Sequence, residues 1–450
     1  MLNSQITYSK NHLNKWFFFI KYPLFLFISF LSWNFFGLLF VLNIYILFNF
    51  LEKSNRKPTH FISYFLESYF FMLLWHLGAT GWLITIDSGV FAILANSIIF
   101  SVPFAIVFIS KKIPKQILLI FIWVLFEILI NSFSFSTPLL TIGNALSNQI
   151  YIIQWYKYTS VIGGSVWLLL ITYFIFNRKK SITLILLVLP SFISIVIFYK
   201  SKNNNLQLKK QLTATIFNPQ YHKANSSSDL SLYVQNKLQY KTDLLIMPES
   251  IIQFNSINYT NTLTYKIFQK IILKNNLQNI FFGVDIKYKK NKRLNAALFL
   301  SKNHSLLKVK KKLVPYSEYL PKIFSFLNSK PSYIFNVKDD SNKIILNYHI
   351  TPVICYEAFF PFYISKNSTN SKLILLIASE RFLNGSYYGK KQYNNILKIR
   401  AIENNLPIIK CSSYGNSMLI NEKGIIVDAS DNKEFYNFKI PNYLIKTDKL

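Results

Sequence analysis

Glu249, Lys310 and Cys355 are three reactive residues that lie beside short apolar runs, far apart in the chain. Glu249 follows Leu-Ile-Met-Pro, Lys310 precedes Lys-Lys-Leu-Val-Pro, and Cys355 follows Pro-Val-Ile. A cysteine attacks carbonyl carbon as its thiolate, a carboxylate can take the thiol proton, and a fixed ammonium can stabilise an oxyanion. Because Cys355 follows an apolar run, we expect its thiol to lie at a strand end, exposed in a cleft.

Each of these residues also has an ordinary structural interpretation. A Pro-Glu pair occurs often at strand ends on the surface, and a lone cysteine is usually a small buried hydrophobe. Lys310 belongs to a basic run with Lys308, Lys311 and Lys312, which is typical of a solvated face. Position alone does not choose among these lysines, so the chemical interpretation depends on further motifs.

Those motifs resemble a known family. The order Glu, Lys, Cys, together with Leu-Val-Pro at 313–315 and Cys-Tyr-Glu at 355–357, resembles the catalytic triad of the nitrilase superfamily. The segments 137–144 and 154–164 resemble a loop of the bacterial apolipoprotein N-acyltransferases. The resemblance implies Glu249 as general base, Lys310 as oxyanion stabiliser and Cys355 as nucleophile. The supporting residues that it implies are Glu318, Tyr356 and Glu357.

The chain departs from the family pattern in four places. Ser379-Glu-Arg-Phe382 stands where the family usually has Asn-Asp-x-Trp, and Tyr316-Ser-Glu318 stands for Phe-Gly-Glu. Lys308 replaces an aromatic residue two positions before the catalytic lysine. The chain stops at Leu450 without the family's final apolar helix, so we expect the second domain to be tethered at one end only.

Composition separates a membrane half from a globular half. Apolar residues dominate from Trp16 to Tyr199, whereas Lys, Asn, Ser and Asp mix with short apolar runs after Lys200. The net charge of +31 includes only five arginines, which disfavours a direct nucleic-acid reader and suits contact with anionic lipid headgroups. The motif around Cys355 needs a free thiol, so we expect no disulfide with Cys411, and neither cysteine has zinc-site spacing.

The membrane half is expected to hold about seven spans, each near the roughly 20 residues that cross a bilayer. The expected spans are Phe17–Trp33, Phe35–Phe50, Tyr69–Ile86, Gly89–Ile109, Gln116–Phe133, Val161–Phe176 and Ser181–Tyr199. Basic groups precede span one and follow spans two, four and six, so the positive-inside rule places all four in the cytoplasm. If residues 17–50 formed one helix, the first group would conflict with the others.

Glu127 lies inside the fifth expected span, where an isolated carboxylate is costly. It should therefore face the interior of the helix bundle or a polar cavity. Two interpretations stay open from sequence: a hydrogen bond to a neighbouring segment, or a part in a lipid-headgroup entrance.

The globular half alternates short apolar runs, typical of strands buried on both faces, with helical stretches. The expected strands are Leu244–Met247, Asn279–Val284, Ala296–Leu300, Thr351–Ile354, Leu373–Ala378 and Pro407–Lys410, and the expected helices are Ser228–Tyr240, Thr262–Lys274 and Gln392–Glu403. This pattern predicts a layered α/β domain, and the resemblance implies the α-β-β-α sandwich of nitrilases. We expect a transmembrane domain over 1–199, a linker over 200–209 and an extracytoplasmic catalytic domain over 210–450.

The resemblance implies an enzyme that moves an acyl chain from a membrane phospholipid, through a Cys355 thioester, to the α-amine of a diacylglyceryl-cysteine on apolipoproteins. It implies no cofactor, no metal and no nucleic-acid partner, a monomer, and a place in the bacterial inner membrane with the catalytic domain on the periplasmic face. Three alternatives are a membrane-tethered nitrilase-type amidase, a degenerate lipoprotein-binding protein, and a transporter. Few charges within the spans and no repeat disfavour the transporter.

Overall fold

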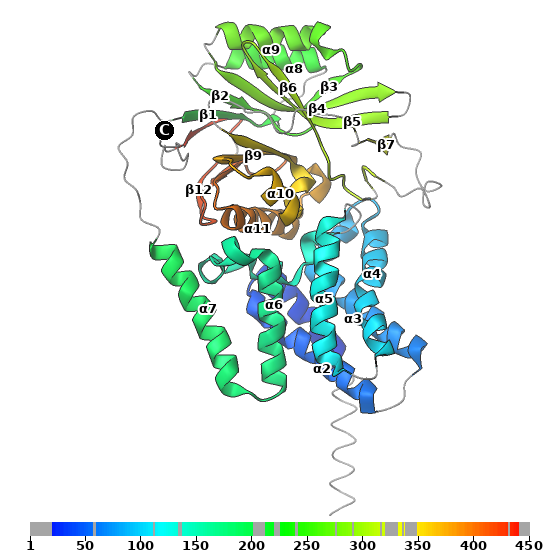
Figure 1. Cartoon of the computed structure of the whole chain (residues 1–450). Coiled ribbons are helices and arrows are strands. Elements are labelled where there is room, and N and C mark those ends of the chain that lie inside the picture. Colours follow the sequence, from blue (N-terminus) through cyan, green and yellow to red (C-terminus); the bar gives the residue numbers. More distant parts are fainter. Residues whose placement is uncertain are drawn as a thin grey trace, which may run out of the picture. The chain divides into compact units, whose positions relative to one another are not determined.

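The computed structural model describes residues 20–56, 60–110, 113–133, 137–200, 212–219, 226–238, 242–274, 277–289, 292–315, 317–319, 332–334, 337, 349–430 and 433–440. The chain forms two compact units (Figure 1). The first unit comprises Met1–Ile130, Ser136–Ile197 and Ser386–Asn395, and the second comprises Asn131–Phe135, Phe198–Gly385 and Ile396–Leu450.

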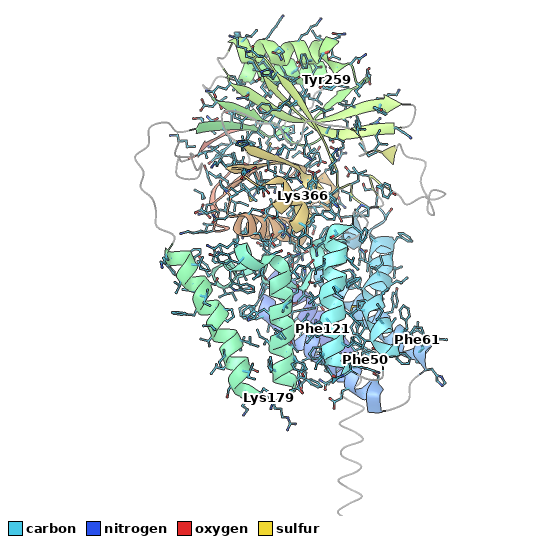
Figure 2. The ribbon with its side chains drawn as sticks, viewed as in Figure 1. Phe50, Phe61, Phe121, Lys179, Tyr259 and Lys366 are labelled. Atoms are coloured by element: carbon cyan, nitrogen blue, oxygen red, sulfur yellow. The ribbon has the colours of Figure 1, made fainter. Side chains whose placement is uncertain are left out.

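The first unit is a bundle of helices. Residues 20–34 are helical, and the helices that follow are α2 (Phe40–Arg56), α3 (Phe61–Thr80), α4 (Gly89–Ile109), α5 (Lys115–Ser132), α6 (Tyr156–Phe176) and α7 (Lys180–Lys200). Among the described residues, five helices are long and apolar enough to cross a membrane. They carry exposed apolar side chains, such as Phe121 on α5, which is 66% exposed and labelled in Figure 2. The chain is a multi-pass membrane protein.

The described helices bear on two of the expected spans. Residues 17–50 do not form one helix, because the first described helix ends at residue 34 and the 3-10 helix η1 (Gly37–Leu39) precedes α2. The start of the expected first span lies outside the described residues. The expected span Tyr69–Ile86 is wrong at both ends, because α3 runs over Phe61–Thr80 and η2 (Gly81–Thr85) follows. Its first half carries Glu67, which pairs with Lys21 at 2.7 Å and lowers the apolar character of the helix.

The first segment that resembles the acyltransferase loop, 137–144, begins a run of short 3-10 turns in the first unit, the first two of them largely buried, and the second segment, 154–164, lies mostly in the first half of α6. The 3-10 turns are η3 (Pro138–Leu140), η4 (Ile142–Asn148) and η5 (Ile150–Ile152). The Glu127 carboxylate, with no exposed surface, accepts hydrogen bonds from the Ile142 amide at 2.8 Å and from Trp123 Nε1 at 3.0 Å. Glu127 therefore holds this loop, which favours the structural interpretation of its burial.

Residues 386–395, from the first half of helix α11 (Tyr387–Asn404), also belong to the first unit. The Gln392 amide nitrogen donates to Asn34 Oδ1 at 2.9 Å and to the Ala79 carbonyl at 2.8 Å, and its oxygen accepts from Trp82 Nε1 at 3.0 Å. Sequence analysis did not predict this grouping.

The second unit contains two sheets. The first has the order β13-β1-β2-β4-β5-β6, with β3 beside β4 and β7 beside β5. Its strands are β1 (Leu212–Phe217), β2 (Leu244–Ile246), β3 (Ile252–Phe254), β4 (Asn279–Lys289), β5 (Lys292–Ser301), β6 (Ser305–Val309), β7 (Ser332–Tyr333) and β13 (Phe435–Ile440). The second has the order β12-β11-β10-β9-β8. Its strands are β8 (Ile350–Ile354), β9 (Leu373–Ser379), β10 (Ile408–Ser413), β11 (Met418–Ile420) and β12 (Ile426–Ala429).

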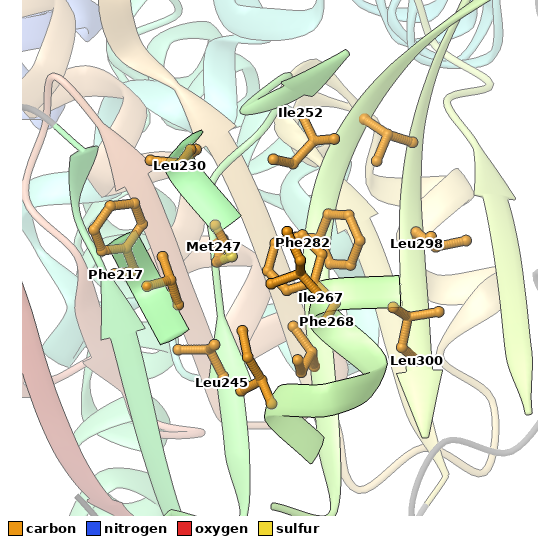
Figure 3. Packing of buried hydrophobic residues seen from close by; sticks show 14 of the residues in the cluster. Phe217, Leu230, Leu245, Met247, Ile252, Ile267, Phe268, Phe282, Leu298 and Leu300 are labelled. Atoms are coloured by element: carbon orange, nitrogen blue, oxygen red, sulfur yellow. The ribbon is translucent and has the colours of Figure 1, made fainter. Parts of the chain in front are cut away.

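The two sheets pack face to face between layers of helices, which confirms the expected α-β-β-α sandwich (Figure 1). Helices α8 (Ser227–Lys237) and α9 (Leu263–Lys274) cover one face of the first sheet, and their apolar side chains form a buried core with β2, β4 and β5 (Figure 3). Helix α10 (Pro361–Asn367) lies next to the second sheet. Between the sheets, the Cys411 thiol on β10 lies 3.6 Å from the Ile246 carbonyl on β2.

Candidate active site

Glu249 is placed by a tight approach between the loop after β2 and strand β4. Pro248 accepts a hydrogen bond from the Gly283 amide at 3.1 Å, and Ser250 adopts φ 51°. A Cβ at Gly283 would lie 2.4 Å from the Cα of Glu249 and 2.5 Å from the Ser250 nitrogen. Gly283 is therefore required for Glu249 to reach its position.

Lys310 follows β6 and is almost completely buried between two carboxylates. Its Nζ lies 2.8 Å from Glu249 Oε1 and 2.9 Å from Glu318 Oε1. Asn295, on β5, donates from Nδ2 to the same two oxygens, at 2.8 Å each. The backbone of Asn295 also accepts from the Lys310 amide at 2.9 Å. The four side chains form one network whose members hold each other in place.

Cys355 directly follows β8 and adopts φ 46°, a left-handed conformation that a non-glycine residue rarely adopts and that is found at functional sites. It interacts electrostatically with Lys310 and Glu249, and the Ser379 backbone hydrogen-bonds its thiol. The side chain is 2% exposed, so the expectation of an exposed thiol is wrong. The thiol lies at the strand end, as expected, but in a closed site.

The protonation states follow from burial and from the charge of the neighbours. Burial and then Glu249 raise the pKa of the Cys355 thiol well above its usual range, although Lys310 acts in the opposite direction. Burial alone would lower the pKa of Lys310, but Glu249, Glu318 and Cys355 outweigh it and hold that pKa well above its usual value. The closed site therefore contains a neutral thiol beside an ammonium.

The three expected supporting residues lie at different distances from this centre. Glu318 contacts Lys310 directly and accepts from the Val314 amide at 2.8 Å, which fixes its own loop. Glu357, two residues after Cys355, is completely buried, and its Oε2 accepts a hydrogen bond from the Ile354 amide at 2.9 Å. The Tyr356 ring packs against Phe359 and Phe360, with ring centroids 5.2 and 5.5 Å away.

The segment that departs from the family pattern, Ser379–Phe382, contributes backbone to the site. The Ser379 amide donates to Glu249 Oε2 at 3.0 Å. Glu380, which follows it, is buried, forms an ion pair with Lys410 on β10 and accepts from Ser412 Oγ at 2.9 Å. This pair holds the turn that presents the Ser379 amide.

Sequence analysis missed two polar residues of the site, Asn295 and Asp285. They face each other across β4 and β5 in the antiparallel register. Asp285 lies 3.3 Å from Ser250 Oγ and 3.4 Å from the Tyr333 hydroxyl, and burial, Glu249 and Glu318 raise its pKa to about 6. In the sequence, Asp285 and Asn295 are each a polar residue inside an otherwise apolar run, and this pattern could have identified them as candidate site residues.

The described residues contain no cluster of three or more His, Cys, Asp or Glu side chains that could hold a metal ion. Both cysteines are free thiols. The arrangement of base, cation and nucleophile suits covalent acyl transfer: the base can take the thiol proton, and the cation can face the oxygen of an acyl group on sulfur.

The chain is similar to known proteins along most of its length. Residues 213–436 match the carbon-nitrogen hydrolase family, and residues 24–174 match the apolipoprotein N-acyltransferase N-terminal domain.

Three curated relatives are each named apolipoprotein N-acyltransferase. The relative from Rickettsia typhi is 35% identical over 28% of this chain and 26% of its own length. The one from Aquifex aeolicus is 25% identical over 61% and 63%, and the one from Chlorobaculum tepidum is 23% identical over 80% and 78%. The chain thus spans less than two thirds of the length of the first two. With matches in both its helical and its α/β unit, the chain belongs to the apolipoprotein N-acyltransferase family of the nitrilase superfamily.

Proposed function

We propose that this protein transfers an acyl chain from a membrane phospholipid to the α-amine of an N-terminal diacylglyceryl-cysteine on apolipoproteins. The observation that carries the proposal is the buried ammonium of Lys310, held by Glu249 and Glu318 beside the Cys355 thiol. The multi-pass helical unit supports it, since both substrates are lipids that a soluble site cannot reach.

In the first step, Glu249 takes the thiol proton as Cys355 sulfur attacks the ester carbonyl carbon of the phospholipid. A carbon–sulfur bond forms, and the carbonyl oxygen becomes an oxyanion that Lys310 stabilises. The carbon–oxygen bond of the ester then breaks, Glu249 returns the proton to the departing alkoxide, and lysophospholipid leaves. The acyl chain remains on Cys355 as a thioester.

In the second step, the neutral α-amine of the acceptor attacks the thioester carbonyl carbon. A carbon–nitrogen bond forms, Lys310 again faces the oxyanion, and Glu249 takes a proton from the attacking amine. The carbon–sulfur bond breaks, and the proton passes to the Cys355 thiolate. The products are a triacylated lipoprotein and the original thiol.

The raised pKa of Cys355 gives the general base a specific task. With the thiol neutral at rest, a thiolate forms only when Glu249 takes its proton while an acyl donor is present. The protein is proposed to act as a monomer. The basic loops support an inner-membrane protein whose catalytic unit faces the periplasm.

The test uses the full chain in mixed micelles with labelled phosphatidylethanolamine. Intact-mass spectrometry should show a hydroxylamine-sensitive acyl adduct on the wild type and none on Cys355→Ala. Addition of a diacylglyceryl-cysteine peptide should discharge the adduct onto the peptide amine. If water alone discharges it, the protein is a hydrolase. If a folded sample forms no adduct, the degenerate lipoprotein-binding alternative is favoured.

A further inference from the structure

Glu357 joins the two segments that carry the nucleophile and the cation. Its Oε2 accepts from the Ile354 amide at 2.9 Å, directly before Cys355. Its Oε1 accepts from the Lys311 amide at 2.7 Å, directly after Lys310. One carboxylate thus ties the end of β8 to the loop after β6, and its geometry sets the separation of Cys355 from Lys310.

This carboxylate has no exposed surface, so its charge must be compensated inside the protein. Lys308, the last residue but one of β6 and itself 6% exposed, supplies a cation. Its Nζ lies 3.3 Å from Glu357 Oε1 and 2.7 Å from the Tyr363 hydroxyl on α10. The Tyr363 hydroxyl donates to the same Glu357 oxygen at 2.9 Å.

Lys308 thus completes a largely buried triangle with Glu357 and Tyr363. Lys312 also interacts electrostatically with Glu357. Lys308 does not contact the reacting atoms in this arrangement. Its effect on the chemistry must pass through Glu357.

We propose that Lys308 is a positioning residue: its ammonium holds the Glu357 carboxylate in place, so that both carboxylate oxygens accept backbone amides and keep Cys355 and Lys310 in register. This inference rests on the proposed function, because it concerns the same acyl-transfer site.

The test compares Lys308→Met with the wild type in the full chain, in detergent micelles. Acylation of Cys355 is measured with phosphatidylethanolamine and, separately, with the soluble ester p-nitrophenyl butyrate. We expect the acylation rate to fall by about 10- to 100-fold, as for a displacement of about 1 Å at a reacting group.

Two further variants separate positioning from general destabilisation. Lys308→Arg keeps the charge and should restore most of the rate. Relative to Glu357→Gln alone, the double variant Lys308→Met/Glu357→Gln should lose little further rate, since Lys308 acts through the Glu357 carboxylate. Lys366→Met, which removes an exposed lysine from α10, is the matched control and should behave as the wild type.

A Lys308→Met protein that retains its fold and the wild-type rate would overturn the inference, and so would a loss of rate that arginine does not rescue. The two acyl donors, phospholipid and soluble ester, allow the test of Lys308 to be separated from the test of the proposed function. If the wild type reacts with the soluble ester but not with the phospholipid, the proposed function fails while the positioning test is still read from the ester.

Discussion

Lys310 faces more negative charge than it carries, and this imbalance gives two predictions about single residues. Glu249 and Glu318 both contact its ammonium, and Asp285 interacts electrostatically with the same two carboxylates. The lysine therefore contributes to folding as well as to the proposed chemistry.

Lys310→Met should lower the rate of Cys355 acylation by about 100- to 1,000-fold, as expected when an oxyanion donor is removed. It should also destabilise the second unit by about 3 to 5 kcal/mol, because two buried carboxylates lose their cation. Adding Glu318→Gln should recover stability without recovering activity. Thermal unfolding and thioester formation measure the two effects, and recovery of activity in the double variant would contradict the role of Lys310.

Asp285→Asn should stabilise the folded protein at pH 7.5 by up to about 3 kcal/mol. This energy corresponds to the difference between the folded-state pKa of Asp285 and the ordinary pKa of aspartate. The folded-state pKa of about 6 lies above the ordinary value for aspartate, so the folded state holds the proton more tightly. The contribution of the Asp285 carboxyl group to the free energy of unfolding is therefore greatest below pH 4, and this contribution is lost as the pH rises through 6. Unfolding midpoints at pH 4 and 7.5 test this, since the advantage of the variant should vanish at pH 4.

At the scale of elements, the site depends on how closely the loop after β2 approaches β4. Gly283 lies on β4 where a side chain would overlap the backbone of Glu249 and Ser250. The position of the proposed base is thus set by a residue of a neighbouring strand that has no reactive group.

Gly283→Ala should displace Glu249 and reduce acylation of Cys355 by about 100-fold or more, because a shift of about 1 Å at a reacting group has that effect. Gly81→Ala is the matched control, since a Cβ there meets nothing within 4 Å. The rate of thioester formation distinguishes the two. Equal activity of both variants would show that the loop can move without loss.

The sequence predicted strands β8 and β9 well because nearly all of their residues are buried and apolar. The expected strand Thr351–Ile354 is β8 within one residue, and Leu373–Ala378 is β9 within one residue. Strand β13 was missed, since its Phe-Tyr-Asn-Phe-Lys-Ile mixes polar and apolar positions at an edge of the sheet. Helix α11 begins at Tyr387, five residues before the expected start at Gln392. The prediction began too late because the first five residues, Tyr-Tyr-Gly-Lys-Lys, have no apolar periodicity.

The candidate site was predictable in its residue types and not in its environment. Glu249, Lys310 and Glu318 meet as the resemblance implied. The part played by Asn295 depends on the register of β4 against β5, and the Ser379 amide is a backbone group without a residue signature. The burial of Cys355 depends on long-range packing that a local motif does not encode.

At the scale of the whole molecule, the proposed orientation across the membrane makes a direct prediction about accessibility. Lys179, in the connection between α6 and α7, and Lys366, on α10, are both exposed and are labelled in Figure 2. In the proposed orientation, which follows the positive-inside rule, Lys179 lies in the cytoplasm and the second unit lies outside.

In spheroplasts, a membrane-impermeant maleimide should label Lys366→Cys at once and Lys179→Cys only after lysis. The native thiols give a low background because both are buried. Mass spectrometry of the labelled peptides identifies the site. Labelling of Lys179→Cys in intact spheroplasts would reverse the proposed orientation.

The closed surroundings of Cys355 also bear on its resistance to oxidation. Peroxides attack thiolates that are accessible to solvent, and this thiol is buried with a raised pKa. An unreacted enzyme outside the cytoplasm would therefore keep its nucleophile reduced without a dedicated reductant. A covalent inhibitor would need to resemble an acyl donor closely enough to recruit Glu249, and simple thiol-directed drugs should react slowly.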